Sequence, residues 1–166
     1  MLSPQVAFQI VAYDIRTFGD PVLTSVAEQV ENIDGKIVRL SQAMLQAMYQ
    51  APGLGLAAPQ IGVPLRVFSY NADGQIGYLI NPEIRELSGG VSLVDEGCLS
   101  VPGLWHKTPR HKFARVVGFN LAGEQVEISG EGLLGQALQH ECDHLDGLLY
   151  LDRLESDERK AAMRAL

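Results

Sequence analysis

The chain has 166 residues, of which 46% are hydrophobic and 20% are charged, as expected for a folded domain with a buried core. It contains 13 Lys and Arg residues and 20 Asp and Glu residues, so its formal net charge is −7. An acidic chain without a cluster of Lys and Arg is not expected to bind nucleic acid directly. We see no internal repeat or linker and expect a single domain over residues 1–166.

The first residues and the two cysteines are informative about the cellular location of the protein. The segment MLSPQVAFQIVAYDIR has no basic residue before its short apolar run, and Asp14 and Arg16 soon interrupt that run. We therefore expect no secretory signal. No apolar run approaches the roughly 18 residues that a membrane-spanning helix needs. We expect a cytoplasmic protein without a membrane association, in which Cys98 and Cys142 stay reduced.

Turn residues and apolar spacing predict the elements in chain order. Residues 17–23 are expected to form a loop that enters a helical turn capped by Asp20. Residues 36–50 carry one apolar stripe at helical spacing, and Ala51–Pro52–Gly53 should end that helix. A glycine-rich loop, GLGLAAPQIG, follows at 53–62.

The residues after this loop are expected to form the strands first and the main helix after them. Because strands cluster before that helix, the order favours an α+β fold with antiparallel strands packed around it. Leu133, Ala137, Leu138 and Leu145 should form its apolar face, and Ser156 should cap the terminal helix. The expected strands are 65–70, 76–81, 113–119 and 125–129, and the expected helices are 132–146 and 156–166.

The strongest chemical signal is the pentad His140–Glu141–Cys142–Asp143–His144, which holds two of the four histidines in the chain. On a helix, residues four apart lie on one face, so both imidazoles can reach one metal ion. The H-E-x-x-H pattern is typical of metal-dependent hydrolases in which the Glu is the general base. Cys142 is rotated about 200° from His140 and should pack in the core.

A catalytic metal needs a third protein ligand and an open position. Only 22 residues follow His144, which directs the search upstream to Cys98, His106 or His111. Cys98 is favoured because a thiolate is a strong ligand for zinc or ferrous iron and because Gly97 leaves room beside it. His106 and His111 lie in the basic stretch WHKTPRHK and are expected to be exposed.

The loop at 53–62 lacks the Lys and the Ser/Thr of a phosphate-binding loop. Gln60 is its one polar side chain that should be buried. Its amide could donate a hydrogen bond to an oxyanion or could satisfy the loop backbone, and the residues alone leave both readings open.

Three stretches together resemble the peptide deformylases: GLGLAAPQIG at 53–62, EGCLSVP at 96–102 and QHECDHLDG at 139–147. The resemblance implies removal of the formyl group from formyl-methionyl nascent peptides. It implies Cys98, His140 and His144 as ligands of ferrous iron, which zinc or another divalent metal replaces in purified protein. It also implies Glu141 as the catalytic acid and base.

The same resemblance extends to the surroundings of the metal. Gln60 and the backbone N–H of Leu99 match the groups that stabilise the oxyanion. Glu96 and Arg110 match a pair that braces the Cys98 loop. The peptide should lie as an extended strand along the glycine-rich segment, in contact with the residues Leu54, Gly55 and Gly97.

Two positions depart from the family pattern. Gln136 stands where an apolar residue near the methionine pocket is common, and Trp105 falls at a variable pocket edge. The partner expected from the family is the formyl-peptide substrate, with a transient ribosome contact as a further expectation and the chain itself a monomer. The short terminal helix has mixed charge, which argues against ribosome docking through a basic tail.

Three other functions fit part of the pattern. A peptidase that cuts internal peptide bonds would use the same pentad. A structural metal site would need four protein ligands and no acid beside them. A cysteine-nucleophile enzyme would use Cys98 with a histidine base and would not depend on a metal.

Overall fold

The computed structural model describes residues 13–50 and 53–166. Within them one five-stranded antiparallel sheet has the order β1-β2-β3-β4-β5, and each strand pairs with the next in sequence. Helices pack against this sheet, so the predicted α+β class is confirmed. The elements are η1 Pro21–Thr24, α1 Gly35–Gln50, β1 Gly55–Ala57, η2 Ala58–Ile61, β2 Val67–Ala72, β3 Gln75–Cys98, β4 Val101–Phe119, β5 Gln125–Gly130, α2 Gly132–Leu145, η3 Tyr150–Arg153 and α3 Ser156–Ala165.

The hairpin of β3 and β4 is much longer than the predicted strands at 76–81 and 113–119. Prolines and the Gly89–Gly90 pair interrupt its alternation, which concealed it from sequence analysis. The ladder passes these points with shifts of register, including one between Ser88 and Val91, where both glycines have positive φ. The hairpin matters for the site because its far end carries Cys98, which pairs in register with Val101.

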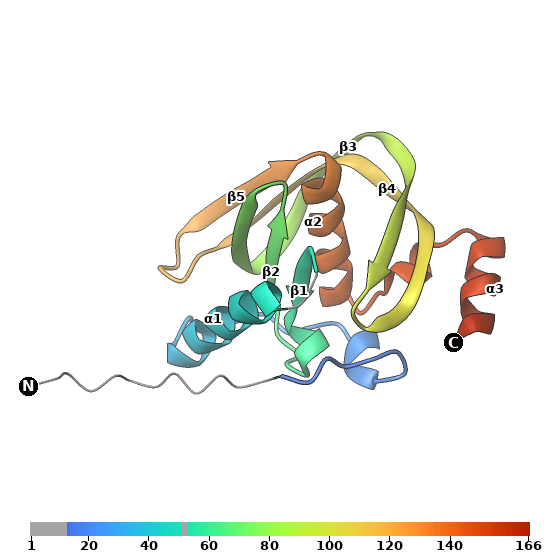
Figure 1. Ribbon diagram of the computed structural model, residues 1–166. Helices are drawn as coiled ribbons and strands as arrows, with labels where there is room; N and C mark the ends of the chain where they lie inside the picture. The colour runs from blue at the N-terminus through green and yellow to red at the C-terminus, as the bar shows by residue number, and fades with distance from the viewer. Residues whose placement is uncertain (1–12, 51–52) are drawn as a thin grey trace, which may run out of the picture.

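Helix α2 lies at the centre of the molecule, between β1 and β2 on one side and the far half of the β3–β4 hairpin on the other (Figure 1). Its core face includes Ala137, Leu138, Cys142 and Leu145, all at most 3% exposed. The prediction for Leu133 is wrong, because that side chain is 47% exposed at the start of the helix. An acidic and imidazole-bearing face remains on the side of α2 that meets the hairpin.

The glycine-rich segment at 53–62 is not an open loop. Gly55–Ala57 forms strand β1 at the edge of the sheet, antiparallel to β2, and η2 follows directly. The absence of a side chain at Gly55 allows this strand to pass close over α2, because a Cβ at this position would overlap the side chain of Glu141. The segment therefore brings an unpaired strand edge next to the pentad.

The ends of the helices test the predicted caps. Asp20 accepts a hydrogen bond from Val22 N at 3.0 Å, as predicted. Ser156 does not cap α3, because it is the first helical residue and Glu155 precedes it. Ala51 and Pro52 of the predicted stop lie outside the described residues. Among the residues that are described, no helix combines the length and apolar character needed to span a membrane.

Candidate metal centre

Helix α2 presents both imidazoles of the pentad to one point. The ring centroids of His140 and His144 are 4.8 Å apart in an edge-on arrangement, and their Nε2 atoms are 3.1 Å apart. Both side chains are shielded from solvent, His144 almost completely. The helical spacing predicted from the sequence therefore places two nitrogen donors side by side.

Cys98 brings a sulfur to the same point from the end of β3. Its Sγ lies 3.3 Å from Nε2 of His144, and one ligand atom from each of Cys98, His140 and His144 lies within 4.8 Å of the other two. The two-residue turn after Cys98 holds the sulfur in place, because Ser100 N donates to it at 3.4 Å. Three side chains, from two elements far apart in sequence, thus converge.

These three donors fit a divalent cation. In a tetrahedral zinc site, metal–nitrogen bonds of about 2.0–2.1 Å and metal–sulfur bonds of about 2.3 Å put neighbouring ligand atoms about 3.3–3.6 Å apart. The observed separations of 3.1 and 3.3 Å are close to these values. Among the described residues the cluster has three members, not the four of a closed structural site.

The carboxylate of Glu96 fixes the orientation of His140. Nδ1 of His140 lies 2.6 Å from Oε1 of Glu96, which is 2% exposed. A neutral ring held in this way keeps its proton on Nδ1 and points the lone pair of Nε2 toward Cys98 and His144. A carboxylate behind a ligating histidine is a common arrangement in metal sites.

Arg110 completes this support. Its Nε and Nη2 both donate to the Glu96 carboxylate, at 3.0 and 2.5 Å, and it is itself 4% exposed. Burial alone would raise the pKa of Glu96, but hydrogen bonds from His140 and Arg110 outweigh it and hold that pKa at about 2. Glu96 therefore stays ionised across the physiological range.

The thiol of Cys98 is in an environment that favours the thiolate. Burial opposes ionisation, but the imidazoles of His144 and His140 attract and hydrogen-bond the sulfur and lower its pKa well below the usual range. The pKa of His140 is raised by Cys98 and Glu96 against the opposing effect of burial. A sulfur that is already anionic is the form that binds a metal.

Glu141 lies beside the cluster in a different environment. It is 2% exposed, and its Oε2 has no hydrogen-bond partner within the described residues. Burial raises its pKa to about 7, against the attraction of His140 and His144. A cation bound at the cluster would favour the ionised form. A buried carboxylate with a free oxygen can take up and release a proton near neutral pH.

Gln60 uses the two ends of its amide differently. Its Oε1 accepts from Ala57 N at 2.9 Å and so holds β1 against η2. Its Nε2 points into the site, 3.5 Å from Cys98 Sγ and 3.2 Å from Ser100 Oγ. The reading in which Gln60 satisfies the loop backbone is thus confirmed for its Oε1 end, and the oxyanion reading for its Nε2 end stays a prediction.

A pocket of about 590 Å³ opens over this cluster. Leu54, Gly55, Gly97 and Leu99 line it together with Gln60, Cys98, His140 and Glu141. Of the two departures from the family pattern, Trp105 forms an exposed edge, and Gln136 lines the wall while its Nε2 donates to Asp95 O at 3.0 Å and Glu96 Oε2 at 3.3 Å.

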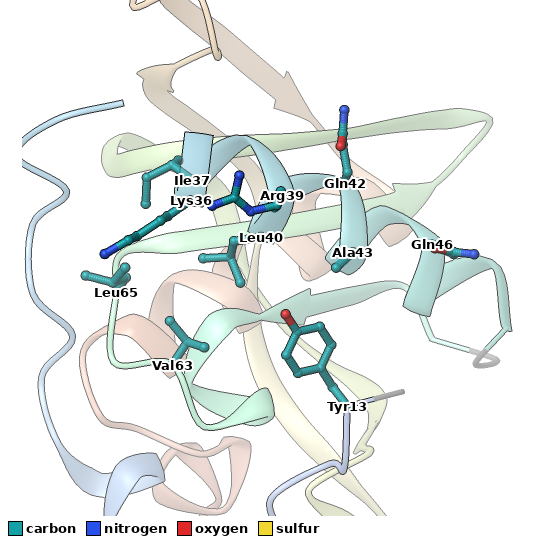
Figure 2. A pocket seen from close by; sticks show the side chains of 10 residues that line it. All are labelled: Tyr13, Lys36, Ile37, Arg39, Leu40, Gln42, Ala43, Gln46, Val63 and Leu65. Atoms are coloured by element: carbon teal, nitrogen blue, oxygen red, sulfur yellow. The ribbon is translucent and has the colours of Figure 1, made fainter. Parts of the chain in front are cut away.

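A second cavity, of about 720 Å³, lies against α1 (Figure 2). None of its lining residues is a Cys, His, Asp or Glu, so it offers no metal ligand set. The lining residues are Tyr13, Lys36, Ile37, Arg39, Leu40, Gln42, Ala43, Gln46, Val63 and Leu65. The larger cavity is therefore not the candidate for catalysis.

Two histidines that were predicted to be exposed are shielded by the fold. His106 is not exposed, because its side chain is 13% accessible and Nδ1 lies 2.7 Å from Glu158 Oε2. His111 is half-buried on β4, and its backbone N–H donates to Gln139. Neither belongs to the cluster. Cys142 is 3% exposed in the core, as predicted, and burial raises its pKa.

Comparison with known proteins places the chain in a family. A family model described as polypeptide deformylase matches residues 12–160. The chain belongs to the polypeptide deformylase family. It is 51% identical over 152 residues to a peptide deformylase of Acidothermus cellulolyticus, covering 92% of this chain and 84% of that protein. Membership in this family makes the chain an enzyme.

Solved deformylase structures share the fold. The peptide deformylase of Thermus thermophilus superposes with a TM-score of 0.87 and 40% identity, covering 93% of this chain and 92% of that one. The peptide deformylase of Synechococcus elongatus in complex with actinonin gives 0.86 and 34% identity, with 92% and 86% covered. The antiparallel sheet and central helix of this chain are thus those of the deformylase family.

The buried position of Glu96 behind His140 generates a prediction about this family member. Glu96→Gln removes the charge that faces Arg110 and weakens the hold on the Nδ1 proton of His140. We expect metal affinity to fall about 10- to 100-fold, measured by competition with a chromogenic chelator.

Glu86→Gln is the matched control. Glu86 is on the same strand and pairs with Arg115 at the surface, so its removal should leave metal affinity unchanged. Equal affinities of the Glu96 variant and this control would contradict a supporting role for Glu96.

Proposed function

We propose that this deformylase family member is a metal-dependent hydrolase that removes the N-terminal formyl group from formyl-methionyl nascent peptides and releases formate. The observation that carries the proposal is the convergence of Cys98, His140 and His144 beside Glu141 in one pocket. Three ligands leave a coordination position open, and a buried acid stands next to it, as a hydrolytic metal site requires.

The strand edge beside the pocket supports an extended peptide substrate. β1 ends the sheet, so the edge not paired with β2 can hydrogen-bond an incoming strand. We propose that the peptide lies antiparallel or parallel to β1 along Leu54 and Gly55, opposite Gly97. The first side chain of the peptide would pack against the pocket wall formed by Leu99, Leu133 and Ala137. Gln136 adds a polar group to this wall.

In the proposed mechanism, Cys98, His140 and His144 would hold a divalent cation, which would supply the Lewis acidity that polarises the formyl carbonyl and acidifies water. Glu141 takes one proton from the attacking water and delivers it to the methionyl nitrogen as the C–N bond breaks. The water oxygen ends in formate, and the peptide leaves with a free amine. Nε2–H of Gln60 and N–H of Leu99 donate to the developing oxyanion.

We propose iron(II) as the ion in the cell. Zinc or another divalent ion would replace it during purification, because iron(II) binds nitrogen and sulfur donors less tightly than zinc. Four further expectations stay predictions: a single catalytic domain over residues 1–166, a monomeric state, a cytoplasmic location and a transient ribosome contact.

Glu141→Gln tests the proton-transfer role. The amide cannot accept a proton from water, so we expect the variant to retain its metal and to lose about 10²- to 10⁴-fold in kcat on a formyl-Met peptide. The unformylated peptide is assayed in parallel, and neither the wild type nor the Glu141 variant should cleave it.

Glu131→Gln is the control, since Glu131 is exposed immediately before the same helix. Turnover by the Glu141 variant at the level of this control would refute the base role. Cleavage of the unformylated peptide would instead identify an endopeptidase.

Gly55→Ala tests the close passage of β1 over the acid. The added methyl group would overlap the buried Glu141 side chain, which would have to shift from its present position. We expect about a 10²-fold loss of kcat/KM with unchanged metal content. Gly53→Ala is the control, because a Cβ there meets its nearest atoms at an ordinary 3.5 Å. Similar kinetics of the two variants would show that this contact does not position Glu141.

A further inference from the structure

Asp143, inside the pentad but not part of the metal cluster, is buried between two guanidinium groups. Its Oδ2 accepts from Arg110 Nη1 at 2.7 Å. Arg153, in η3, donates from Nη2 to Oδ1 at 2.7 Å and from Nε to Oδ2 at 3.1 Å. Asp143 is 5% exposed, and such a carboxylate needs partners of opposite charge.

These contacts continue to a metal ligand. Arg110 binds Asp143 with one nitrogen and Glu96 with the other two, and Glu96 accepts from Nδ1 of His140. From Arg153 through Asp143 and Arg110 to Glu96, the charges of the side chains alternate in sign. Each contact in this network, including the one from Glu96 to His140, is a hydrogen bond of 2.5 to 3.1 Å. The network runs from a half-exposed side chain in η3 to the ligand His140.

The balance of charge depends on Arg153. Without it, the buried carboxylates of Glu96 and Asp143 would have one shared guanidinium, that of Arg110. Arg110 would then be drawn toward Asp143, and its two-nitrogen grip on Glu96 would loosen. Glu96 could no longer hold His140 in a single orientation, which is the step that affects a metal.

We propose that Asp143 and Arg153 are positioning residues of the metal centre, acting on His140 through Arg110 and Glu96. The proposal rests on the metal site proposed above, and it adds an outer layer of residues that determine how firmly the ion is held. Arg153 reaches the network from the surface, so its removal opens no core cavity.

Arg153→Leu tests the proposal in the metal-loaded protein. We expect the metal to be lost to an excess of chelator about 3- to 10-fold faster than from the wild type. This effect is smaller than the one expected for a residue that hydrogen-bonds a metal ligand directly. The cobalt(II)-loaded variant should also show a shifted visible spectrum, since a reoriented imidazole changes the ligand field. Arg153→Lys keeps the charge but not the paired donors and should fall between the variant and the wild type.

Arg159→Leu is the matched control. Arg159 is 48% exposed against 47% for Arg153, and it pairs with Asp152 outside the network. Its rate of metal loss and its cobalt spectrum should equal those of the wild type. Equal values for the Arg153 and Arg159 variants would overturn the proposal.

A double-mutant cycle tests the route. In a Glu96→Gln background, Arg153→Leu should change the rate of metal loss less than 2-fold, because the link to His140 is already broken. The same factor in both backgrounds would show that Arg153 acts by another path, which also overturns the proposal. A wild-type protein that binds no cobalt would instead refute the proposed metal-dependent function.

Discussion

The hydrogen bond between Glu96 and His140 joins the two halves of the site. Glu96 precedes Cys98 by two residues on β3, and His140 lies on α2, so this one contact sets the strand that carries the sulfur against the helix that carries the nitrogens. At 2.6 Å between buried groups, it fixes both the distance between the elements and the direction of the imidazole lone pair. The candidate cluster of Cys98, His140 and His144 depends on this alignment.

One short helix serves three functions with different faces. Leu138, Cys142 and Leu145 anchor α2 in the core, while His140 and His144 face the end of the hairpin. Gly55 lets the edge strand pass over Glu141, so the acid and the path proposed for the substrate are adjacent. A rigid, buried scaffold for these groups agrees with the need to hold reacting atoms in register.

The sequence predicted the clustering of Cys98, His140 and His144 better than it predicted the extent of the strands. The helical spacing of His140 and His144 is a local property, and Cys98 stood out by residue type. The long hairpin was missed because its prolines and glycines break the alternation that marks a strand, while the backbone accommodates them with changes of register.

The burial of His106 and Asp143 was also beyond the reach of the sequence. His106 lies in a basic stretch, yet Glu158 from the terminal helix covers it. Asp143 stood in the pentad, but its partners Arg110 and Arg153 come from a strand and a turn that only the folded chain brings together. Such pairings depend on tertiary packing, which no local pattern encodes.

X-ray absorption at the metal edge of the reconstituted protein tests the central claim most directly. The account predicts one sulfur and two imidazole nitrogens from the protein, with the remaining scattering from light atoms supplied by solvent. Loss of the sulfur signal in Cys98→Ser would locate that ligand. A wild-type spectrum without sulfur, or one with four protein ligands, would contradict an open site built by Cys98, His140 and His144.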